Sequence, residues 1–324
     1  MFESILSLLC RYERIILHRH TCPDGDALGS QIGLKHLILA NLPGKEVHMV
    51  GDAPGRYAFM EDSAPETLPD EAFSGALAVI LDTSAPALIS DPRYTLAAAT
   101  ARIDHHIFCG RIADTEVTDT AFESCCGLVI ALAMEAGWKV PPIAANALYT
   151  GMVTDSGRFR YDSTSAGTFL RAAFLMEQAP IPLEEIYGRL YEEDLSRIRL
   201  RGRFMNAIQL TPAGTAYIYT DRATMESLGV DTFNISRGMA NLMADIKGVC
   251  NWVNFTECPQ GVLCELRSNR CNINPIAVKY GGGGHAKASG ATLPDRETAM
   301  AMLRDLDALS RKQAVCRESQ GTSQ

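Results

Sequence analysis

The sequence has no long hydrophobic run, no leader segment of the usual type and no paired cysteine motif. No apolar stretch approaches the roughly 18 residues that a membrane span requires, so a transmembrane protein is not expected. The N-terminal segment MFESILSLLCRYERIILHRH has neither a basic start nor a small-residue cleavage site, unlike a signal peptide. The ten cysteines include no C-x-x-C pair, which argues against a structural zinc site. We therefore expect reduced cysteines and a cytoplasmic protein.

Basic residues are too few for a protein that grips long duplex nucleic acid. Lys and Arg number 30 against 38 Asp and Glu, which gives a formal net charge of -8 and a pI near 5.4. Non-specific binding of long nucleic acid depends on neutralising many phosphates, which an acidic protein does poorly. A short polyanion is a different case, because metal ions and a local basic cluster can supply the positive charge.

The first half of the chain alternates patterns that are typical of strands and helices. Apolar and β-branched runs predict strands, and apolar residues at helical spacing predict helices. The predicted strands are 15–20, 46–51, 76–81 and 100–104, and the predicted helices are 27–40, 122–136, 143–153 and 165–177. This alternation predicts an α/β fold with a doubly wound, mostly parallel sheet that helices cover on both faces.

The sequence Pro-Ile-Pro at 180–182 marks a change of pattern. A charged stretch follows and predicts a connecting helix, whose arginines either form i,i+4 ion pairs in solvent or face a polyanionic ligand. A smaller α+β domain comes next, with a strand at 216–220, a hairpin of 249–256 and 262–266, and helices at 236–246 and 296–309. The predicted organisation is a first domain over 1–182, a linker helix over 183–209, a second domain over 210–312 and a disordered tail over 313–324. We expect the active-site cleft between the two domains.

Acidic and histidine side chains gather at the predicted strand ends of the first domain. They are His20, Asp24 and Asp26 after the first strand, Asp82 after the third, Asp104, His105 and His106 at the fourth, and Asp155 in the segment MVTDSGRF. Each has an ordinary interpretation alone, because Pro-Asp-Gly-Asp forms turns, aspartate caps helices and histidine can sit in a core. Strand ends are where open α/β sheets place their ligands. Together the carboxylates and imidazoles suit Mn²⁺ or a similar ion and predict a centre of two ions.

A glycine-rich segment is the other unusual feature. Four consecutive glycines at 281–284 are followed by His285. Glycine lets the backbone approach a ligand closely and turn its N–H groups toward it, although a flexible loop is the alternative. Further polar residues precede the segment, namely Arg267, Ser268 and Asn274. Since the planar guanidinium of arginine binds phosphate through two hydrogen bonds, this combination favours a phosphate or nucleotide clamp.

The order of the acidic and histidine motifs resembles the DHH phosphoesterase superfamily. The motifs are H-x-x-x-D-x-D, D-T-S, D-H-H and T-D-S-G-R-F, in that order along the chain. The resemblance implies two ligand sets that share Asp82: His20, Asp24 and Asp82 for one ion, and Asp26, Asp82, His105 and Asp155 for the other. It also implies that Asp104 orients an imidazole and that His106 points at the phosphate. Mn²⁺ is the expected ion, with Mg²⁺ and Co²⁺ as alternatives, and a hydroxide from metal-bound water is the expected nucleophile.

The glycine-rich segment resembles the DHH-associated C-terminal domain. The pattern that carries the resemblance is R-S…N-x-I-A-x-x-x-G-G-G-G-H-x-x-A-x-G. It implies substrate contacts for Arg267, Gly283, Gly284 and His285, and further contacts for Asn274 and Ser268. Arg160 also fits the family pattern, with a substrate contact and a structural role both open.

Within this superfamily the chain resembles the stand-alone nano-RNases. That resemblance implies hydrolysis of oligonucleotides of a few residues to 5′-mononucleotides, and of 3′-phosphoadenosine 5′-phosphate to AMP. A phosphodiesterase of cyclic or linear dinucleotide messengers, such as c-di-AMP or pApA, is the alternative with the same architecture. A non-catalytic nucleotide sensor would be indicated by a missing metal ligand, and the motifs lack none. The expected partners are short RNA or DNA oligonucleotides or dinucleotides, and a second copy of the chain, since the family commonly forms dimers.

Overall fold

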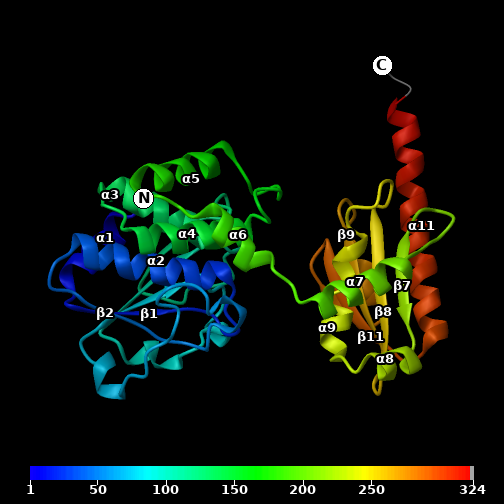
Figure 1. Cartoon of the computed structure of the whole chain (residues 1–324), viewed down its shortest axis with the longest axis horizontal. Coiled ribbons are helices and arrows are strands. Elements are labelled where there is room, and N and C mark those ends of the chain that lie inside the picture. The colour runs from blue at the N-terminus through cyan, green and yellow to red at the C-terminus, as the bar shows by residue number, and fades with distance from the viewer. Residues whose placement is uncertain (322–324) are drawn as a thin grey trace. The chain divides into compact units, whose positions relative to one another are not determined.

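The computed structural model describes residues 1–321, without the side chains of residues 233, 234 and 312–321. It divides the chain into two compact units, Met1–Glu192 and a second unit that begins at Glu193 (Figure 1). The first is built on a five-stranded sheet and the second on a six-stranded sheet, which confirms the predicted fold class. Within residues 1–311 every cysteine is a free thiol. No helix among residues 1–321 is long and apolar enough to cross a membrane.

The sheet of the first unit is entirely parallel. Its strands are β1 (Arg14–His18), β2 (Glu46–Met49), β3 (Leu77–Leu81), β4 (Ala99–Asp104) and β5 (Thr115–Thr118). Their spatial order is β2-β1-β3-β4-β5. This is a doubly wound order in which the direction of winding reverses between β1 and β3, the position where such folds bind ligands.

Alternating side chains of these strands face two different layers. Ile15 and Leu17 of β1 lie in the main core, while Ile16 packs on the opposite face with Phe73. The main core holds α1 (Glu3–Arg11), α2 (Gly25–Asn41), α3 (Cys125–Ala136), α4 (Pro142–Asp155), α5 (Ala166–Gln178) and α6 (Leu183–Tyr191). The opposite face is covered by loops and by the short 3₁₀ helices η2 (Asp70–Phe73) and η4 (Pro92–Leu96), so the predicted cover of α-helices on both faces is not observed among the described residues. Two further 3₁₀ helices are η1 (Gly55–Tyr57), where Tyr57 packs against the main core, and η3 (Pro86–Leu88).

The second unit is an α+β domain on a mixed sheet. Its strands are β6 (Gln209–Leu210), β7 (Ala216–Thr220), β8 (Asn251–Cys258), β9 (Gly261–Ser268), β10 (Gly283–Gly284) and β11 (Ala288–Leu293), in the order β10-β11-β9-β8-β7-β6. The predicted strand at 216–220 and the predicted hairpin, now β8 and β9, are confirmed. The helices are α7 (Leu195–Asn206), α8 (Arg222–Leu228), α9 (Thr232–Ser236), α10 (Asn274–Lys279) and α11 (Arg296–Gly321), with the 3₁₀ turn η5 (Ala240–Met243).

The boundary between the two units differs from the sequence-based prediction. The single linker helix expected over 183–209 is wrong, because α6 and α7 are separate helices and the unit boundary falls between them. Ile186 and Leu190 of α6 are buried in the core of the first unit, so this helix belongs to that unit. Charge spacing at i,i+4 fits one long helix and two consecutive helices equally well, which is why the sequence did not separate them.

The predicted helix at 236–246 is also wrong. Its apolar residues are buried as a helix would bury them, but Leu242 N–H donates to Met239 and Ala244 N–H to Asn241, the i→i+3 bonds of a 3₁₀ turn. Helix α11 continues as far as Gly321, within the segment 313–324 for which a disordered tail was predicted, and residues 322–324 lie outside the described part of the chain. The tail stays a prediction.

Candidate active site

The predicted metal ligands converge at the carboxyl ends of three neighbouring strands. His20 lies two residues after β1, Asp82 directly follows β3, and His105 directly follows β4. These strands are adjacent in the sheet in the order β1-β3-β4, so their ends meet at one edge. The loop after β1 leads into α2, which carries Asp26, and α4 ends at Asp155.

Close packing of α2 against α4 brings Asp155 to this edge. A Cβ atom on Gly151 of α4 would lie 2.8 Å from the carbonyl oxygen of Gly25 and 2.3 Å from the sulfur of Cys126. A Cβ on Gly29 of α2 would lie 2.5 Å from the carbonyl oxygen of Ala147. The glycines therefore permit a helix contact that any larger residue would force apart.

The first ligand group contains His20, Asp24 and Asp82. His20 Nε2 lies 3.7 Å from Asp24 Oδ1 and 3.5 Å from Asp82 Oδ2. The other ring nitrogen, Nδ1, lies 2.8 Å from the backbone oxygen of Thr21. A hydrogen bond from Nδ1 to a carbonyl fixes the imidazole with its Nε2 lone pair directed at the carboxylates, the arrangement that metal-binding histidines adopt.

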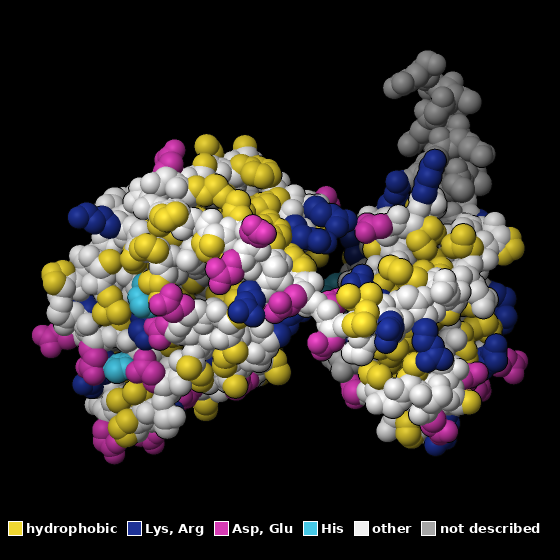
Figure 2. Space-filling view, viewed as in Figure 1, with side chains coloured by type: hydrophobic (Ala, Val, Ile, Leu, Met, Phe, Trp, Pro, Cys, Tyr) yellow, Lys and Arg dark blue, Asp and Glu magenta, His cyan; other side chains and the backbone are white. Residues whose placement is uncertain are grey.

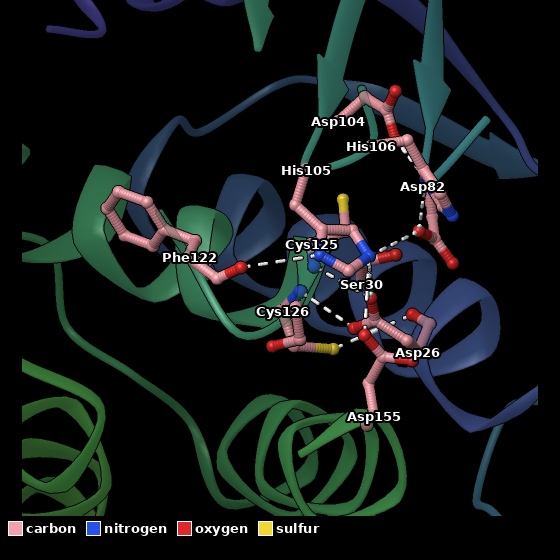
Figure 3. A network of polar contacts seen from close by, with 12 residues as sticks. Asp26, Ser30, Asp82, Asp104, His105, His106, Phe122, Cys125, Cys126 and Asp155 are labelled. Carbon is pink, nitrogen blue, oxygen red and sulfur yellow. Dashed lines mark hydrogen bonds and ion pairs between the residues drawn. The ribbon is translucent and has the colours of Figure 1, made fainter. Parts of the chain in front are cut away.

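The second ligand group is built around His105 (Figure 3). His105 Nε2 lies 3.7 Å from Asp26 Oδ2, 3.4 Å from Asp82 Oδ1 and 3.3 Å from Asp155 Oδ2. Its Nδ1 faces the backbone oxygen of Phe122 at 3.4 Å, as Figure 3 shows. The two histidines therefore use the same orientation, with Nδ1 toward a carbonyl and Nε2 toward shared carboxylates.

Asp26 is held by the amino end of α3. Its two carboxylate oxygens accept hydrogen bonds from the backbone N–H groups of Cys125 at 2.7 Å and Cys126 at 2.8 Å. These N–H groups have no partner within the helix, and the helix dipole favours an anion at this end. Asp26 is fully buried, so the bonds fix its orientation toward His105.

Asp82 belongs to both ligand groups, and its surroundings show whether a metal ion fits beside it. It is 2% exposed, and its Oδ1 is a buried oxygen that makes no hydrogen bond, although His105 Nε2 lies 3.4 Å and His106 Nδ1 lies 3.6 Å away. Its backbone has φ of +51°, a left-handed conformation that costs energy for a residue other than glycine and that occurs mainly at functional sites. A buried carboxylate oxygen without a hydrogen bond requires positive charge, which a divalent cation between the two groups would supply. The described residues thus form candidate metal-binding clusters, and the donor set fits the predicted ions.

The charges of the site also favour a bound cation. Burial lowers the pKa of His20, but hydrogen bonds to Asp24 and Asp82 outweigh it and raise the pKa to about 11. Burial likewise opposes protonation of His105, whose pKa is still raised to about 10, mainly by Asp82 and Asp26. Burial raises the pKa of Asp155 to about 6. The side chains therefore carry an excess of negative charge that protons neutralise when no cation does.

His106 is oriented differently from His105. Its Nδ1 lies 2.7 Å from Asp104 Oδ1, and its side chain is 45% exposed. Asp104 is fully buried and forms a second ion pair with Arg102. Because Asp104 occupies the Nδ1 side, the Nε2 edge of the ring is left for a ligand from solvent. The contact with His106 is the one that the predicted role of Asp104 in orienting an imidazole requires, and the role of His106 at a phosphate stays a prediction.

In the second unit, Arg267 lies beside the glycine-rich segment. Ala288 of β11 pairs with Arg267 of β9, and Gly283 and Gly284 pair with Gly290 and Ser289. The four glycines are therefore not a loose loop, because half of them form strand β10. Arg267 Nη2 lies 3.0 Å from Glu265 Oε2, and this ion pair holds the guanidinium of Arg267 in place.

Two of the predicted substrate residues bind backbone groups instead. The Ser268 hydroxyl accepts from the N–H of Cys271 at 2.7 Å and donates to the carbonyl of Cys250 at 3.1 Å, which fixes the turn after β9. Asn274 donates to the carbonyl of Gly284 at 2.7 Å, so it shapes the glycine segment. In the first unit, Arg160 is exposed and its backbone N–H donates to Ser156 at 3.0 Å, within the turn after Asp155.

One residue near the metal groups was not predicted from the sequence. Tyr57 lies at the end of η1, and burial raises its pKa, an effect to which the charges of Asp24 and Asp155 add. The charges of these two carboxylates therefore act on the Tyr57 hydroxyl. Nothing in the local sequence distinguishes it from an ordinary surface tyrosine, because it reaches the site through a long loop.

Comparison with known proteins identifies the family. The model of the DHH family, N-terminal domain, matches residues 14–152, and the model of the DHHA1 domain matches residues 227–312. The "Bifunctional oligoribonuclease and PAP phosphatase NrnA" of Bacillus subtilis (strain 168) is 32% identical over 315 residues, which cover 96% of this chain and 99% of that protein. The chain belongs to the DHH family. The resemblance inferred from the motifs is thereby confirmed.

Two further proteins are similar to this chain over nearly its full length. The protein of the same name from Mycoplasma genitalium is 31% identical over 297 residues, with 90% of this chain and 92% of that protein covered. The crystal structure of an exopolyphosphatase-related protein from Bacteroides fragilis has a TM-score of 0.83 at 24% identity and covers 96% of both chains. The structural match shows that the two-unit DHH fold extends over nearly the whole chain.

Proposed function

We propose that this DHH-family protein is a metal-dependent phosphoesterase that degrades short oligonucleotides to 5′-mononucleotides. We also propose that it removes the 3′-phosphate of 3′-phosphoadenosine 5′-phosphate. The observation that carries the proposal is Asp82, whose two oxygens face His20 on one side and His105 on the other. Two cation sites that share one carboxylate are the arrangement that clamps a phosphoryl group between two metal ions. The full-length relatives, each named as a bifunctional oligoribonuclease and PAP phosphatase, support the substrate class.

Mn²⁺ is the ion we propose for the site. Its ligands would be His20, Asp24 and Asp82 for one position. For the other they would be Asp26, His105 and Asp155, which form a second candidate cluster, and Asp82, whose Oδ1 lies 3.4 Å from His105 Nε2. Carboxylates and imidazoles suit Mn²⁺, and thiolate ligands, which would favour zinc, do not join the set. Burial raises the pKa of Cys125, the thiol beside the site, so it stays protonated. When bound, the ions supply a hydroxide from water at neutral pH and offset the negative charge at phosphorus.

The chain's own residues supply the remaining steps. His106 presents its Nε2 edge to solvent, where it can donate a hydrogen bond to a phosphate oxygen or to the leaving oxygen, and Asp104 holds the ring at Nδ1. In the second unit we propose that Arg267 and His285 bind a phosphate of the same substrate, together with the backbone of Gly283 and Gly284. Asn274 and Ser268 would support that surface through their backbone contacts, and Arg160 stays a predicted contact.

The surface supports a small substrate rather than a long one. Acidic, basic and apolar side chains are mixed over the face of each unit that Figure 2 shows, and the net charge of the chain is -8. An extended basic track of the kind that holds long nucleic acid is not seen on that face. A cleft between the two domains, a homodimer and a cytoplasmic location stay predictions.

The proposal is tested by hydrolysis of three substrates in parallel. They are the 5′-phosphorylated dinucleotide pApA, 3′-phosphoadenosine 5′-phosphate and cyclic di-AMP, each with Mn²⁺ and with EDTA. We expect rapid Mn²⁺-dependent release of AMP from the first two and slow reaction of the third. A preference for cyclic di-AMP would favour the messenger phosphodiesterase, and tight binding of all three without hydrolysis would indicate a nucleotide sensor.

A further inference from the structure

Arg102 is a fully buried arginine on the strand that ends at the DHH motif. It is 0% exposed and lies in β4, two residues before Asp104. Because side chains alternate along a strand, Arg102 and Asp104 point to the same face of the sheet. On the neighbouring strand β5, Glu116 stands in register with Arg102. A buried arginine between two acidic residues is a costly arrangement that needs an explanation.

The guanidinium of Arg102 contacts both Asp104 in the candidate active site and the loop that follows strand β4. Nη2 forms a buried ion pair with Asp104 Oδ2. Nη1 lies 3.3 Å from the carbonyl oxygen of Gly110 and 3.5 Å from Glu116 Oε1. The other oxygen of Asp104, Oδ1, lies 2.7 Å from His106 Nδ1. The three side chains thus form a linear series, Arg102 to Asp104 to His106, that runs from the sheet interior to solvent.

Asp104 alone would not fix the imidazole of His106. A buried carboxylate without a cation is unfavourable and would turn to any other donor within reach. Arg102 removes that freedom, since it occupies Oδ2 and leaves only Oδ1 to His106. Its other terminal nitrogen, Nη1, donates to the carbonyl oxygen of Gly110, so the same guanidinium also fixes the loop that follows His106. The rigid guanidinium can hold both partners at once, whereas a lysine ammonium offers no such fixed fork.

We propose that Arg102 is a positioning residue for the reaction, and that it acts through Asp104 on the orientation of His106. This inference rests on the proposed phosphoesterase function. It assigns a role to a residue outside the DHH motif that neither binds a predicted metal nor touches the substrate. Its consequence is that the rate of the chemical step depends on Arg102 while metal binding does not.

The first test compares Arg102→Met and Arg102→Lys with the matched control Glu116→Gln. The control changes the other acidic partner of Arg102 but leaves the series to His106 intact. For Arg102→Met we expect kcat on pApA to fall by about tenfold to a hundredfold, the usual effect of removing a group that orients a reacting side chain. KM and the number of Mn²⁺ ions bound should stay unchanged. Arg102→Lys should recover part of kcat, and Glu116→Gln should match the wild type.

A double-mutant cycle then separates positioning from general destabilisation. If Arg102 acts through Asp104, Arg102→Met should add little to the loss in kcat already caused by Asp104→Asn. Independent losses that multiply in the double variant would overturn the proposal, as would an equal loss of kcat in Glu116→Gln. If Arg102→Met does not fold, Arg102→Lys replaces it in the same cycle, with the same two outcomes.

A spectroscopic measurement keeps the inference separate from the proposed function. NMR signals of the His106 ring in the metal-free protein need no enzymatic activity. We expect one sharp set in the wild type and in Glu116→Gln, and broadened or multiple sets in the Arg102 variants. Unchanged ring signals would overturn the positioning role, even if the protein is an active phosphoesterase. A wild type without hydrolytic activity would instead refute the proposed function and leave the ring measurement valid.

Discussion

His105 and Asp155 approach within 3.3 Å, Nε2 to Oδ2, although one follows strand β4 and the other ends helix α4. Strand ends alone therefore do not build the candidate metal centre. It also depends on how closely α4 packs on α2, and this packing rests on small residues such as Gly151. The stability of the helix layer and the assembly of the second ligand group are consequently linked.

Replacing Asp82 should remove both ion sites together. We expect Asp82→Asn to bind fewer than two Mn²⁺ ions and to lose activity by on the order of a thousandfold or more, because one oxygen of this carboxylate faces His20 and the other faces His105. Asp91→Asn is the matched control, since Asp91 is a largely buried carboxylate of the same unit that pairs with Arg93. Metal content by elemental analysis and initial rates check the prediction. Two bound ions and near-normal rates in Asp82→Asn would contradict it.

Gly151→Ala should destabilise the first unit and weaken the second ligand group. The new methyl group would meet the carbonyl oxygen of Gly25, a backbone atom that cannot move aside easily. We expect a loss of about 1–3 kcal/mol in the free energy of unfolding, as for overpacked cores, together with reduced activity. Gly188→Ala is the control, because Gly188 lies exposed within α6 and a Cβ there meets nothing within 4 Å.

The control should raise the free energy of unfolding by about 0.5–1 kcal/mol, since alanine favours helix more than glycine does. Urea unfolding followed by circular dichroism measures both variants. Equal stabilities for Gly151→Ala and the wild type would show that α2 and α4 can separate without cost.

Much of the fold was predictable because hydrophobic periodicity is a local signal. The strands β1, β3 and β4 are rich in apolar or β-branched residues, and each was predicted within about two residues. The edge strand β5 was missed, since the four residues Thr115–Thr118 show too little pattern. The break between α6 and α7 was missed because burial of Ile186 and Leu190 against the first unit is a tertiary contact.

The candidate site was predictable for a different reason. Its ligands are rare in such number at strand ends, and their order along the chain matches a known motif series. What the sequence could not provide was the supporting layer. In the sequence, Arg102 looks like an ordinary strand residue, and only the structure shows its ion pair with Asp104. Ser268 was predicted as a substrate contact, and only the structure shows its hydrogen bonds to the backbone. Such roles depend on three-dimensional neighbours rather than on residue type.

Arg267 should contribute to substrate binding and not to metal binding. We expect Arg267→Ala to raise KM for pApA by roughly tenfold to a hundredfold, the effect of losing a charged hydrogen bond to phosphate, with the Mn²⁺ content unchanged. Arg222→Ala is the control, because Arg222 is an exposed arginine of the same unit that pairs with Glu226 at 3.2 Å. Steady-state kinetics on pApA measure KM for both variants. An unchanged KM in Arg267→Ala would remove this residue from the proposed clamp.

Metal binding should release protons and weaken as the pH falls. The neighbouring carboxylates outweigh burial and raise the pKa of His20 to about 11 and that of His105 to about 10, so both imidazoles are protonated at neutral pH before metal binds. Only the neutral imidazole is a ligand, so each ion must displace a proton. The affinity for Mn²⁺ should therefore decrease as the pH falls below about 10, and activity at a fixed, subsaturating Mn²⁺ concentration should decrease with it.

Calorimetric titration with Mn²⁺ in two buffers of different ionisation enthalpy measures the released protons directly. Identical heats in the two buffers, or full activity at pH 5, would contradict the histidine ligands.

The central claim is that two metal ions and a substrate clamp act together on a short oligonucleotide. Its most direct test is the rate of hydrolysis of 5′-phosphorylated RNA across a series of lengths, from dinucleotide through pentanucleotide to a strand of 24 residues, with Mn²⁺ and with EDTA. We predict fast Mn²⁺-dependent release of 5′-mononucleotides from the shortest substrates and a steep fall in rate with length. Cleavage of the longest strand at a comparable rate, or cleavage that persists in EDTA, would contradict the account.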